Sequence, residues 1–211
     1  MMQPQHAIKR GLDVAVASLL LVLAAPLMLS AALCVWWTMG TPILFRQKRP
    51  GLRGRPFTIL KFRTMSEGTQ PDAVRITKLG AFLRRTSLDE LPEFWNVIRG
   101  DMSLVGPRPL LMQYLNRYSP EQMRRHEVLP GITGLAQVNG RNALSWEERL
   151  TLDVWYVDHY DFWLDAKILL RSLALVWNQH GISHHQHATM PEFLGSAKAE
   201  ANSTVTAPLV E

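Results

Sequence analysis

The sequence predicts a mostly helical α+β protein, in which an N-terminal re-entrant membrane helix precedes a small β-hairpin and interfacial helices around a cytosolic core. Three observations predict it: a long uncharged run near the N-terminus, two short β-rich runs around a turn, and apolar residues at helical spacing after them. We divide the 211 residues into a membrane segment over 1–45, a cytosolic and interfacial domain over 46–178, and a polar, His-containing tail over 179–211 that is expected to be disordered.

The chain is basic, with 23 lysine and arginine residues against 18 acids and a pI near 9.7. This balance suits a partner that carries phosphate, such as a nucleotide, a nucleic acid or an anionic membrane surface. The hypothesis that the chain binds nucleic acid is supported by the pI alone, because the sequence has no helix-turn-helix, zinc-finger or RNA-binding signature. The single cysteine, Cys34, excludes an intrachain disulfide and favours a protein that faces the cytosol.

The uncharged run extends over 14–45. As a straight helix it would measure about 48 Å, whereas the hydrocarbon core of a bilayer is about 30 Å thick. Pro26 lies near its middle and should kink it, because proline cannot donate a helix hydrogen bond. A signal peptide fits less well, since the run is too long and lacks a convincing small-residue cleavage site.

Basic residues lie on both sides of this run. Lys9 and Arg10 precede it, and the cations that follow it are Arg46, Lys48, Arg49, Arg53, Arg55, Lys61 and Arg63. Because positive flanks stay in the cytoplasm, this pattern favours a helix that enters, breaks near Pro26 and returns to the same face. Backbone groups freed at the break need partners, and Ser30 is one candidate. A single tilted span is the alternative, and the charges alone do not decide between the two.

Two short apolar and β-branched runs follow, over 42–49 and 56–65, separated by the turn-rich "PGLRG". They predict a β-hairpin at the membrane surface, where its basic residues could contact anionic head groups.

The next stretch, "TSLDELPEFWNVIRGD", carries two adjacent acids, Asp89 and Glu90. Ser87 and Glu90 have the spacing of a capping box, so the acids could merely begin a helix. The alternative is a catalytic pair. Apolar spacing on either side predicts two short helices with the acids at their joint, and Pro92 in the first turn of the second helix.

Two arginines stand in segments with restricted or glycine-rich backbone. Arg108 lies between two prolines, which would hold its guanidinium in place for bidentate phosphate binding, although an exposed turn arginine is the commoner case. Arg141 ends the glycine-rich "GITGLAQVNGR", just before a helix expected to be capped near Ser145. That loop matches neither a Walker A motif nor a dinucleotide fingerprint. The aromatic-rich stretch over 146–177 fits either an interfacial helix or a core helix.

Taken together, these segments resemble the small monotopic phosphoglycosyl transferases, the bacterial sugar transferase family that begins glycan assembly on undecaprenyl phosphate. The resemblance covers about residues 8–177 and rests on an ordered set of motifs. These are "KRGLDVAVASLLL", the proline-broken helix, "FRQKRPGLRGRPFTILKFRTM", "FLRRTSLDELPEFWNVIRGDMSLVGPRPLL", "LPGITGLAQVNGRN" and "LDVWYVDHYDFWLDAKILL". One departure is Ala25 before Pro26, where the family often has serine.

The resemblance implies an enzyme of the bacterial inner membrane, with its catalytic domain on the cytoplasmic face. It implies transfer of sugar-1-phosphate from a UDP-sugar to undecaprenyl phosphate, with release of UMP, at the start of exopolysaccharide, capsule, O-antigen or glycoprotein glycan assembly. Asp89 matches the nucleophile that forms an aspartyl phosphosugar, and Glu90 the acid that binds Mg²⁺. Arg84, Arg108 and Arg141 match arginines near the substrate phosphates. Downstream glycosyltransferases are possible partners, and the sugar is left open.

A membrane-anchored scaffold that has lost catalysis is the competing hypothesis. The presence of both acids and all three arginines argues against it.

Overall fold

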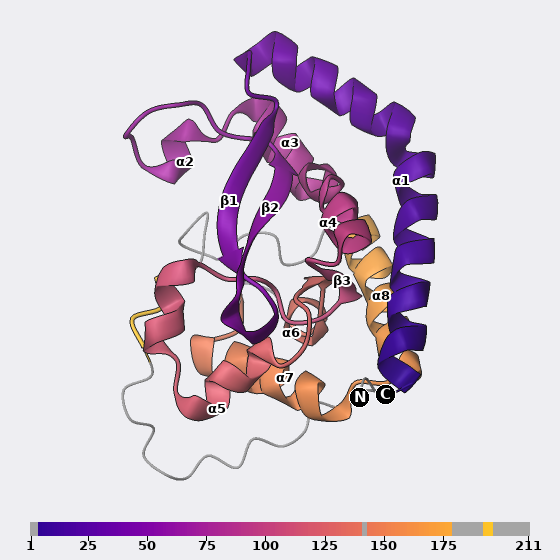
Figure 1. Ribbon diagram of the computed structural model, residues 1–211. Helices are drawn as coiled ribbons and strands as arrows, with labels where there is room; N and C mark the ends of the chain where they lie inside the picture. Colours follow the sequence, from indigo (N-terminus) through magenta and orange to yellow (C-terminus); the bar gives the residue numbers. More distant parts are fainter. Residues whose placement is uncertain (1–3, 141–142, 179–191, 196–211) are drawn as a thin grey trace.

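The computed structural model describes residues 4–140, 143–178 and 192–195 (Figure 1). Within them the chain is mostly helical with two small two-stranded sheets, one antiparallel and one parallel, which confirms the α+β prediction. The helices and strands are α1 (Pro4–Met39), β1 (Leu44–Pro50), β2 (Pro56–Phe62), α2 (Asp72–Arg75), α3 (Lys78–Arg85), α4 (Glu93–Arg99), β3 (Ser103–Val105), α5 (Pro120–Met123), β4 (Gly131–Thr133), α6 (Leu135–Val138), α7 (Trp146–His159) and α8 (Phe162–Asn178). Short 3₁₀ turns are η1 (Leu52–Gly54), η2 (Leu88–Glu90), η3 (Met112–Arg117) and η4 (Arg124–His126).

Helix α1 contains the uncharged run and is long and apolar enough to cross a membrane. It stays helical through Pro26, and Figure 1 shows it bent rather than straight. Proline cannot donate to the carbonyl four residues earlier, that of Val22. Ser30 does not fill this gap, because its Oγ donates to the Pro26 carbonyl instead, 2.9 Å away. Such a hydroxyl bond within a helix itself favours bending.

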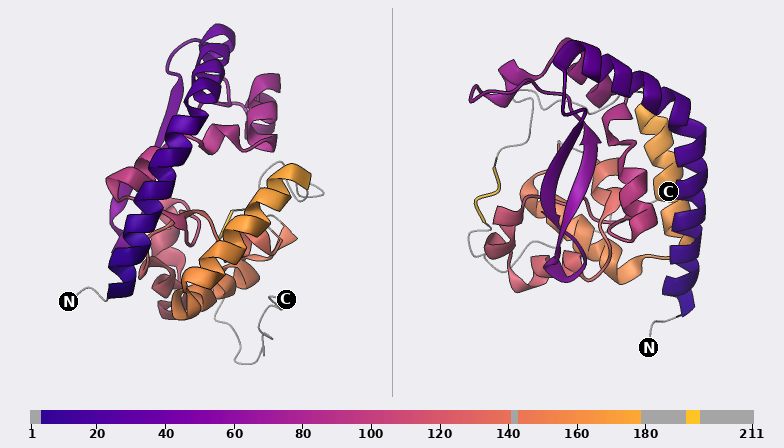
Figure 2. Two further views of the ribbon diagram at one scale, coloured as in Figure 1. Left: turned by 90° about the vertical axis from the view of Figure 1, so that its right-hand side faces the viewer. Right: turned by 45° about the horizontal axis from the view of Figure 1, so that its top comes forward.

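Both ends of α1 are fastened to the same body of the protein. Near its start, Arg10 Nη2 donates to the Val97 carbonyl at the end of α4, 2.6 Å away. At its end, Arg63 Nη2 donates to the Gly40 carbonyl, 2.7 Å away. Both contacts give carbonyl groups near the ends of helices a charged side-chain donor. Between them, most of the apolar surface of α1 is exposed, and Figure 2 shows α1 and α8 on the same side of the molecule.

Strands β1 and β2 form the predicted hairpin, in register from Leu44 opposite Phe62 to Pro50 opposite Pro56. Its outer edge is closed by the side chain of Asn96, which is fully buried in α4. Asn96 Oδ1 accepts from the Leu60 amide at 3.1 Å, and its Nδ2 donates to the Thr58 carbonyl at 2.8 Å. The amide group thus continues the strand ladder and fixes α4 against β2.

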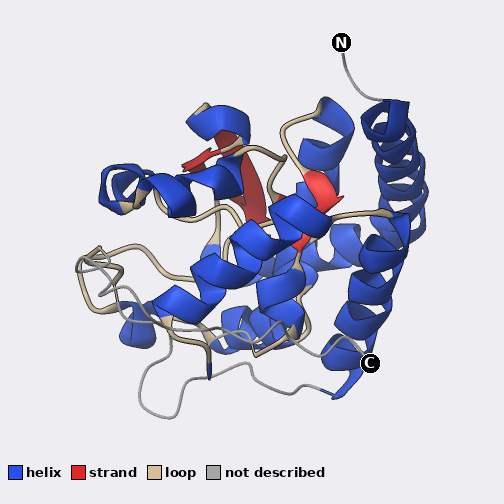
Figure 3. Cartoon of the chain, turned by 90° about the horizontal axis from the view of Figure 1, so that it is seen from below, coloured by secondary structure: helices blue, strands red, loops and turns tan. Residues whose placement is uncertain are grey.

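The parallel pair of β3 and β4 was not predicted: the segment of β3 was given no secondary structure, and that of β4 was expected to be a glycine-rich loop. Ser103 pairs with Gly131 and Val105 with Thr133. Gly106 and Gly131 lie so close together that a side chain on either would collide with the other's backbone. Figure 3 shows the strands of the two small sheets lying among the helices.

The aromatic-rich stretch forms two helices that differ in burial. α7 begins with the predicted serine cap, a capping box of Ser145 and Glu148, and packs into the core. α8 is two-sided: Ile168 is buried, whereas Trp163 and Leu170 are exposed. The core interpretation therefore holds for α7, and α8 presents an apolar face to solvent.

Most of the predicted tail over 179–211, including its histidine-rich part, lies outside the described residues. Residues 192–195 are described and are ordered against the body. Phe193 is only 1 % exposed and packs against the rings of Tyr114, Tyr118 and Trp146.

Candidate active site

The predicted site residues that the structure describes come together in one broad, open cleft of about 2030 Å³. Asp89, Glu90, Arg84 and Arg108 all line it. Its other walls come from the bent part of α1, from β1 and β2, and from the segment before α3. Arg141 lies outside the described residues, so its place relative to the cleft stays a prediction.

The acids stand on η2, the 3₁₀ turn between α3 and α4. Ser87, just before the turn, has a left-handed backbone (φ 57°) and its side chain makes no capping hydrogen bond. The capping-box interpretation of Ser87 and Glu90 is therefore wrong. The Glu90 carboxylate forms ion pairs with cations from other elements and is not bonded to the Ser87 amide, as a capping box would require.

Glu90 is held by two cations. Arg108 Nη2 lies 2.5 Å and Lys61 Nζ 2.6 Å from its Oε1. Burial alone would raise the pKa of Glu90, but the charges and hydrogen bonds of Arg108 and Lys61 outweigh it and keep that pKa well below the ordinary value. Glu90 is therefore ionised across the physiological range.

Lys61 also lies 2.9 Å from Glu93 Oε1, so it joins two carboxylates. Glu93 is 1 % exposed. Burial raises its pKa to about 7 against the opposing charge of Lys61, and the negative charge of Glu90 adds to the rise. Sequence reasoning missed both residues. The signal was present, because Glu93 follows Glu90 by one helical turn and Lys61 is a lone cation between apolar strand residues.

Asp89 differs from its neighbour. It is 8 % exposed, and no hydrogen bond or ion pair engages its carboxylate within the described chain. Burial raises the pKa of Asp89 and the charge of Glu90 raises it further, while Lys61, Arg108 and Arg84 oppose the rise. Among the described residues, Glu90 is thus held by two cations, whereas the Asp89 carboxylate has no bonded partner.

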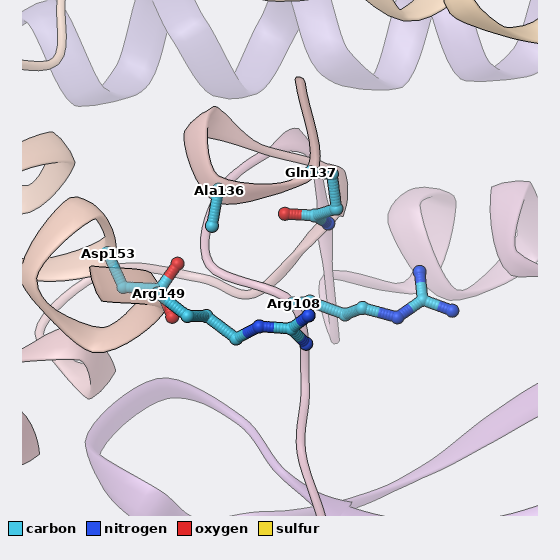
Figure 4. Close-up of a pocket in the computed structure, with 5 residues that line it drawn as sticks. All are labelled: Arg108, Ala136, Gln137, Arg149 and Asp153. Carbon is cyan, nitrogen blue, oxygen red and sulfur yellow. The ribbon is translucent and has the colours of Figure 1, made fainter. Parts of the chain in front are cut away.

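The two arginines reach the cleft from different elements. Arg84, on α3, donates from Nε to Thr64 Oγ1 at 2.9 Å, which fixes the base of the guanidinium. Arg108 bonds Glu90 and also lines a small cavity behind it, of about 10 Å³ (Figure 4). The amide nitrogen and oxygen of Gln137 are buried beside this cavity without a hydrogen-bond partner in the described structure. The cavity's volume and the two polar atoms of Gln137 beside it suit one water molecule.

A long apolar helix beside a cleft of acids and arginines is the arrangement expected of a membrane-associated protein that binds anionic ligands. Comparison with known sequences gives the family: the chain belongs to the bacterial sugar transferase family, whose sequence model matches residues 4–179.

Three relatives illustrate the match. The uncharacterized sugar transferase EpsL of Bacillus subtilis (strain 168) is 50 % identical over 195 residues, covering 90 % of this chain and 96 % of EpsL. The UDP-glucose:undecaprenyl-phosphate glucose-1-phosphate transferase of Caulobacter vibrioides is 45 % identical over 181 residues, with 78 % of this chain and 68 % of that protein covered. The transferase of the same name from Klebsiella pneumoniae is 43 % identical over 177 residues, which cover 76 % of this chain but only 38 % of that longer protein.

Proposed function

We propose that this chain transfers sugar-1-phosphate from a UDP-sugar to undecaprenyl phosphate and releases UMP. The observation that carries the proposal is the unequal environment of two adjacent acids: no described residue bonds the Asp89 carboxylate, whereas Glu90 is held by Arg108 and Lys61. Family membership and the reaction named for two of the relatives support it.

The proposed chemistry has two displacement steps. In the first, a carboxylate oxygen of Asp89 attacks the phosphorus bonded to the sugar, and the bond from that phosphorus to UMP breaks. In the second, a phosphate oxygen of undecaprenyl phosphate attacks the same phosphorus and the carboxylate leaves, which restores Asp89. Arg84 and Arg108 would stabilise the negative charge on the phosphoryl oxygens. Arg141 keeps the same predicted role from outside the described residues.

The carboxylates also fit the predicted Mg²⁺. The described residues contain no group of three or more metal-ligating side chains. Magnesium usually binds through one or two carboxylates together with substrate phosphates, and needs no larger protein cage. Glu90 suits this role, since its lowered pKa keeps it ionised and the described cations bond only its Oε1. Bound there, the ion would neutralise diphosphate charge.

A re-entrant α1 at the cytoplasmic face of the inner membrane completes the proposal. The contacts of Arg10 and Arg63 tie both ends of the apolar helix to one body, which a straight span across the bilayer would separate. Cysteines introduced as Gln5→Cys and Arg55→Cys in a Cys34→Ser background should be labelled by an impermeant maleimide from the same side of sealed vesicles. Labelling from opposite sides would leave only the tilted span.

The cleft also offers a place for the lipid substrate. Its wall includes Leu21, Met28 and Leu29 of α1, and it continues without interruption to the acids and arginines. A prenyl chain could lie along the apolar wall while its phosphate meets the cations.

The proposal is tested by UMP release from a panel of UDP-sugars, namely UDP-glucose, UDP-galactose and UDP-N-acetylated sugars, with Mg²⁺ and undecaprenyl phosphate. Wild-type protein should release UMP with at least one of them. Asp89→Asn should abolish release, and Asp158→Asn, an exposed aspartate outside the cleft, should not. Full turnover by Asp89→Asn would exclude it as nucleophile.

A further inference from the structure

The segment Pro107–Pro109 is held by its carbonyl groups. Two of its three residues are prolines, which have no amide hydrogen to donate. Each of the three carbonyls instead accepts one hydrogen bond, and each donor comes from a different part of the chain. The donors are the Gly131 amide to Pro107 at 3.1 Å, Arg125 Nη2 to Arg108 at 2.7 Å, and Arg49 Nη1 to Pro109 at 3.4 Å.

The central donor, Arg125, belongs to a fully buried ion pair. Its side chain is 1 % exposed and that of Asp153, on α7, is 2 % exposed. Arg125 Nε and Nη2 lie 3.0 and 2.6 Å from Asp153 Oδ2. The Tyr118 ring covers the guanidinium at 5.7 Å. Figure 4 shows the Arg108 side chain extending away from Asp153, so the pair meets Arg108 only through its main chain.

A buried ion pair is poor evidence for a purely stabilising role. Removing two charges from water costs free energy that their attraction barely repays, and well-packed apolar residues in the same place often stabilise a protein as well or better. What an apolar pair could not supply here is the hydrogen bond to the Arg108 carbonyl. That hydrogen bond holds the main chain of Arg108, whose side chain bonds Glu90 and lines the cleft.

We propose that Arg125, oriented by Asp153, is a positioning residue that sets where the Arg108 guanidinium stands in the cleft. This inference rests on the proposed function, in which Arg108 binds the substrate phosphates. A displacement of about 1 Å in a substrate-positioning group can cost about 100-fold in rate. The position of the Arg108 main chain therefore matters for the reaction rate as much as the Arg108 guanidinium does.

The test replaces the whole pair, Arg125→Met together with Asp153→Leu, which removes both charges without leaving one buried alone. Its matched control is Arg124→Met with Asp158→Leu, a neighbouring but exposed pair between the same two elements. The melting temperature, kcat/KM for UMP release, and the Kd for UDP are measured for each. The buried-pair variant should stay folded, lose about 10- to 100-fold in kcat/KM and bind UDP more weakly. The control should match wild type.

Repeating the measurement in an Arg108→Ala variant distinguishes a positioning role of the buried pair from a general loss of structure. In Arg108→Ala, the buried-pair substitution should have little further effect on the Kd for UDP, because the residue it positions is gone. The same loss in both backgrounds would refute the proposal. If the pair variant fails to fold, Arg125→Lys, which keeps a buried cation, is measured in both backgrounds with the same expected non-additivity. Wild-type protein that releases no UMP would overturn the proposed function, whereas additive losses in an active enzyme would overturn only the positioning role.

Discussion

Replacing Asn96 with leucine should weaken the junction between α4 and the hairpin without changing the volume of the core greatly. The side chain is fully buried and bonds two main-chain groups of β2, the Leu60 amide and the Thr58 carbonyl. Leucine has a similar size but no polar atom, so both groups would lose their partner and face an apolar side chain. Each such group costs about 1–3 kcal/mol, and the expected loss in the free energy of unfolding is about 2–6 kcal/mol.

For a domain of this size, that loss corresponds to a drop of at least about 4 °C in the melting temperature. Thermal and urea unfolding in detergent, followed by circular dichroism, would measure it. The matched control is Asn116→Leu, the same substitution at an exposed position, which should change stability by less than about 0.5 kcal/mol. If Asn96→Leu proved no more harmful than this control, the account of the hairpin edge would be refuted.

Three further predictions follow from the cleft and the tail. Burial raises the pKa of Glu93 to about 7 from 4.5, so the folded protein holds this proton longer than the unfolded chain, and stability should fall as pH rises from about 4.5 through 7. Glu93→Gln should reduce that fall by up to about 3 kcal/mol between unfolding measurements at pH 5 and pH 8, and an unchanged pH dependence would contradict the assignment. The raised pKa of Asp89 should place the acid limb of the kcat/KM profile above the range of an ordinary aspartate, while a profile flat down to pH 4 would contradict it. Phe193→Ala should cost about 3 kcal/mol in thermal unfolding, whereas Leu194→Ala, at an exposed neighbour, should cost almost nothing; equal effects would show that the ring does not anchor the tail.

Features that depend on neighbouring residues were predicted well from the sequence. The hairpin follows from two β-rich runs around a glycine-containing turn, and the start of α7 follows from Ser145, a residue type that often caps helices. The bend of α1 follows from one proline in an apolar run. In each case the pattern and the structure it specifies lie within a single segment.

Features that depend on distant residues were not predictable in this way. β3 and β4 have three residues each, too few to show an alternating pattern, and their partners lie far apart in the chain. Ser87 and Glu90 matched a capping box, yet Glu90 is bonded to Lys61 and Arg108, which come from β2 and from the segment after β3. The capping-box pattern was therefore misleading, because the ion pairs of Glu90 form only when distant segments come together in the fold.

The same long-range contacts distinguish the two adjacent acids. On a 3₁₀ turn, successive side chains diverge by about 120°, so neighbours can meet different surroundings. Glu90 faces two cations that lower its pKa, while Asp89 has no bonded partner among the described residues and its pKa is raised by burial. Pairs of acids whose environments drive their pKa values apart are suited to separate chemical roles. An ionised Glu90 fits the proposed electrostatic or metal-binding role, whereas the oxygens of Asp89, which no described residue bonds, fit the proposed role of nucleophile. A raised pKa is compatible with attack, because Arg84, Arg108 and Lys61 already oppose the rise and a more basic carboxylate is the better nucleophile.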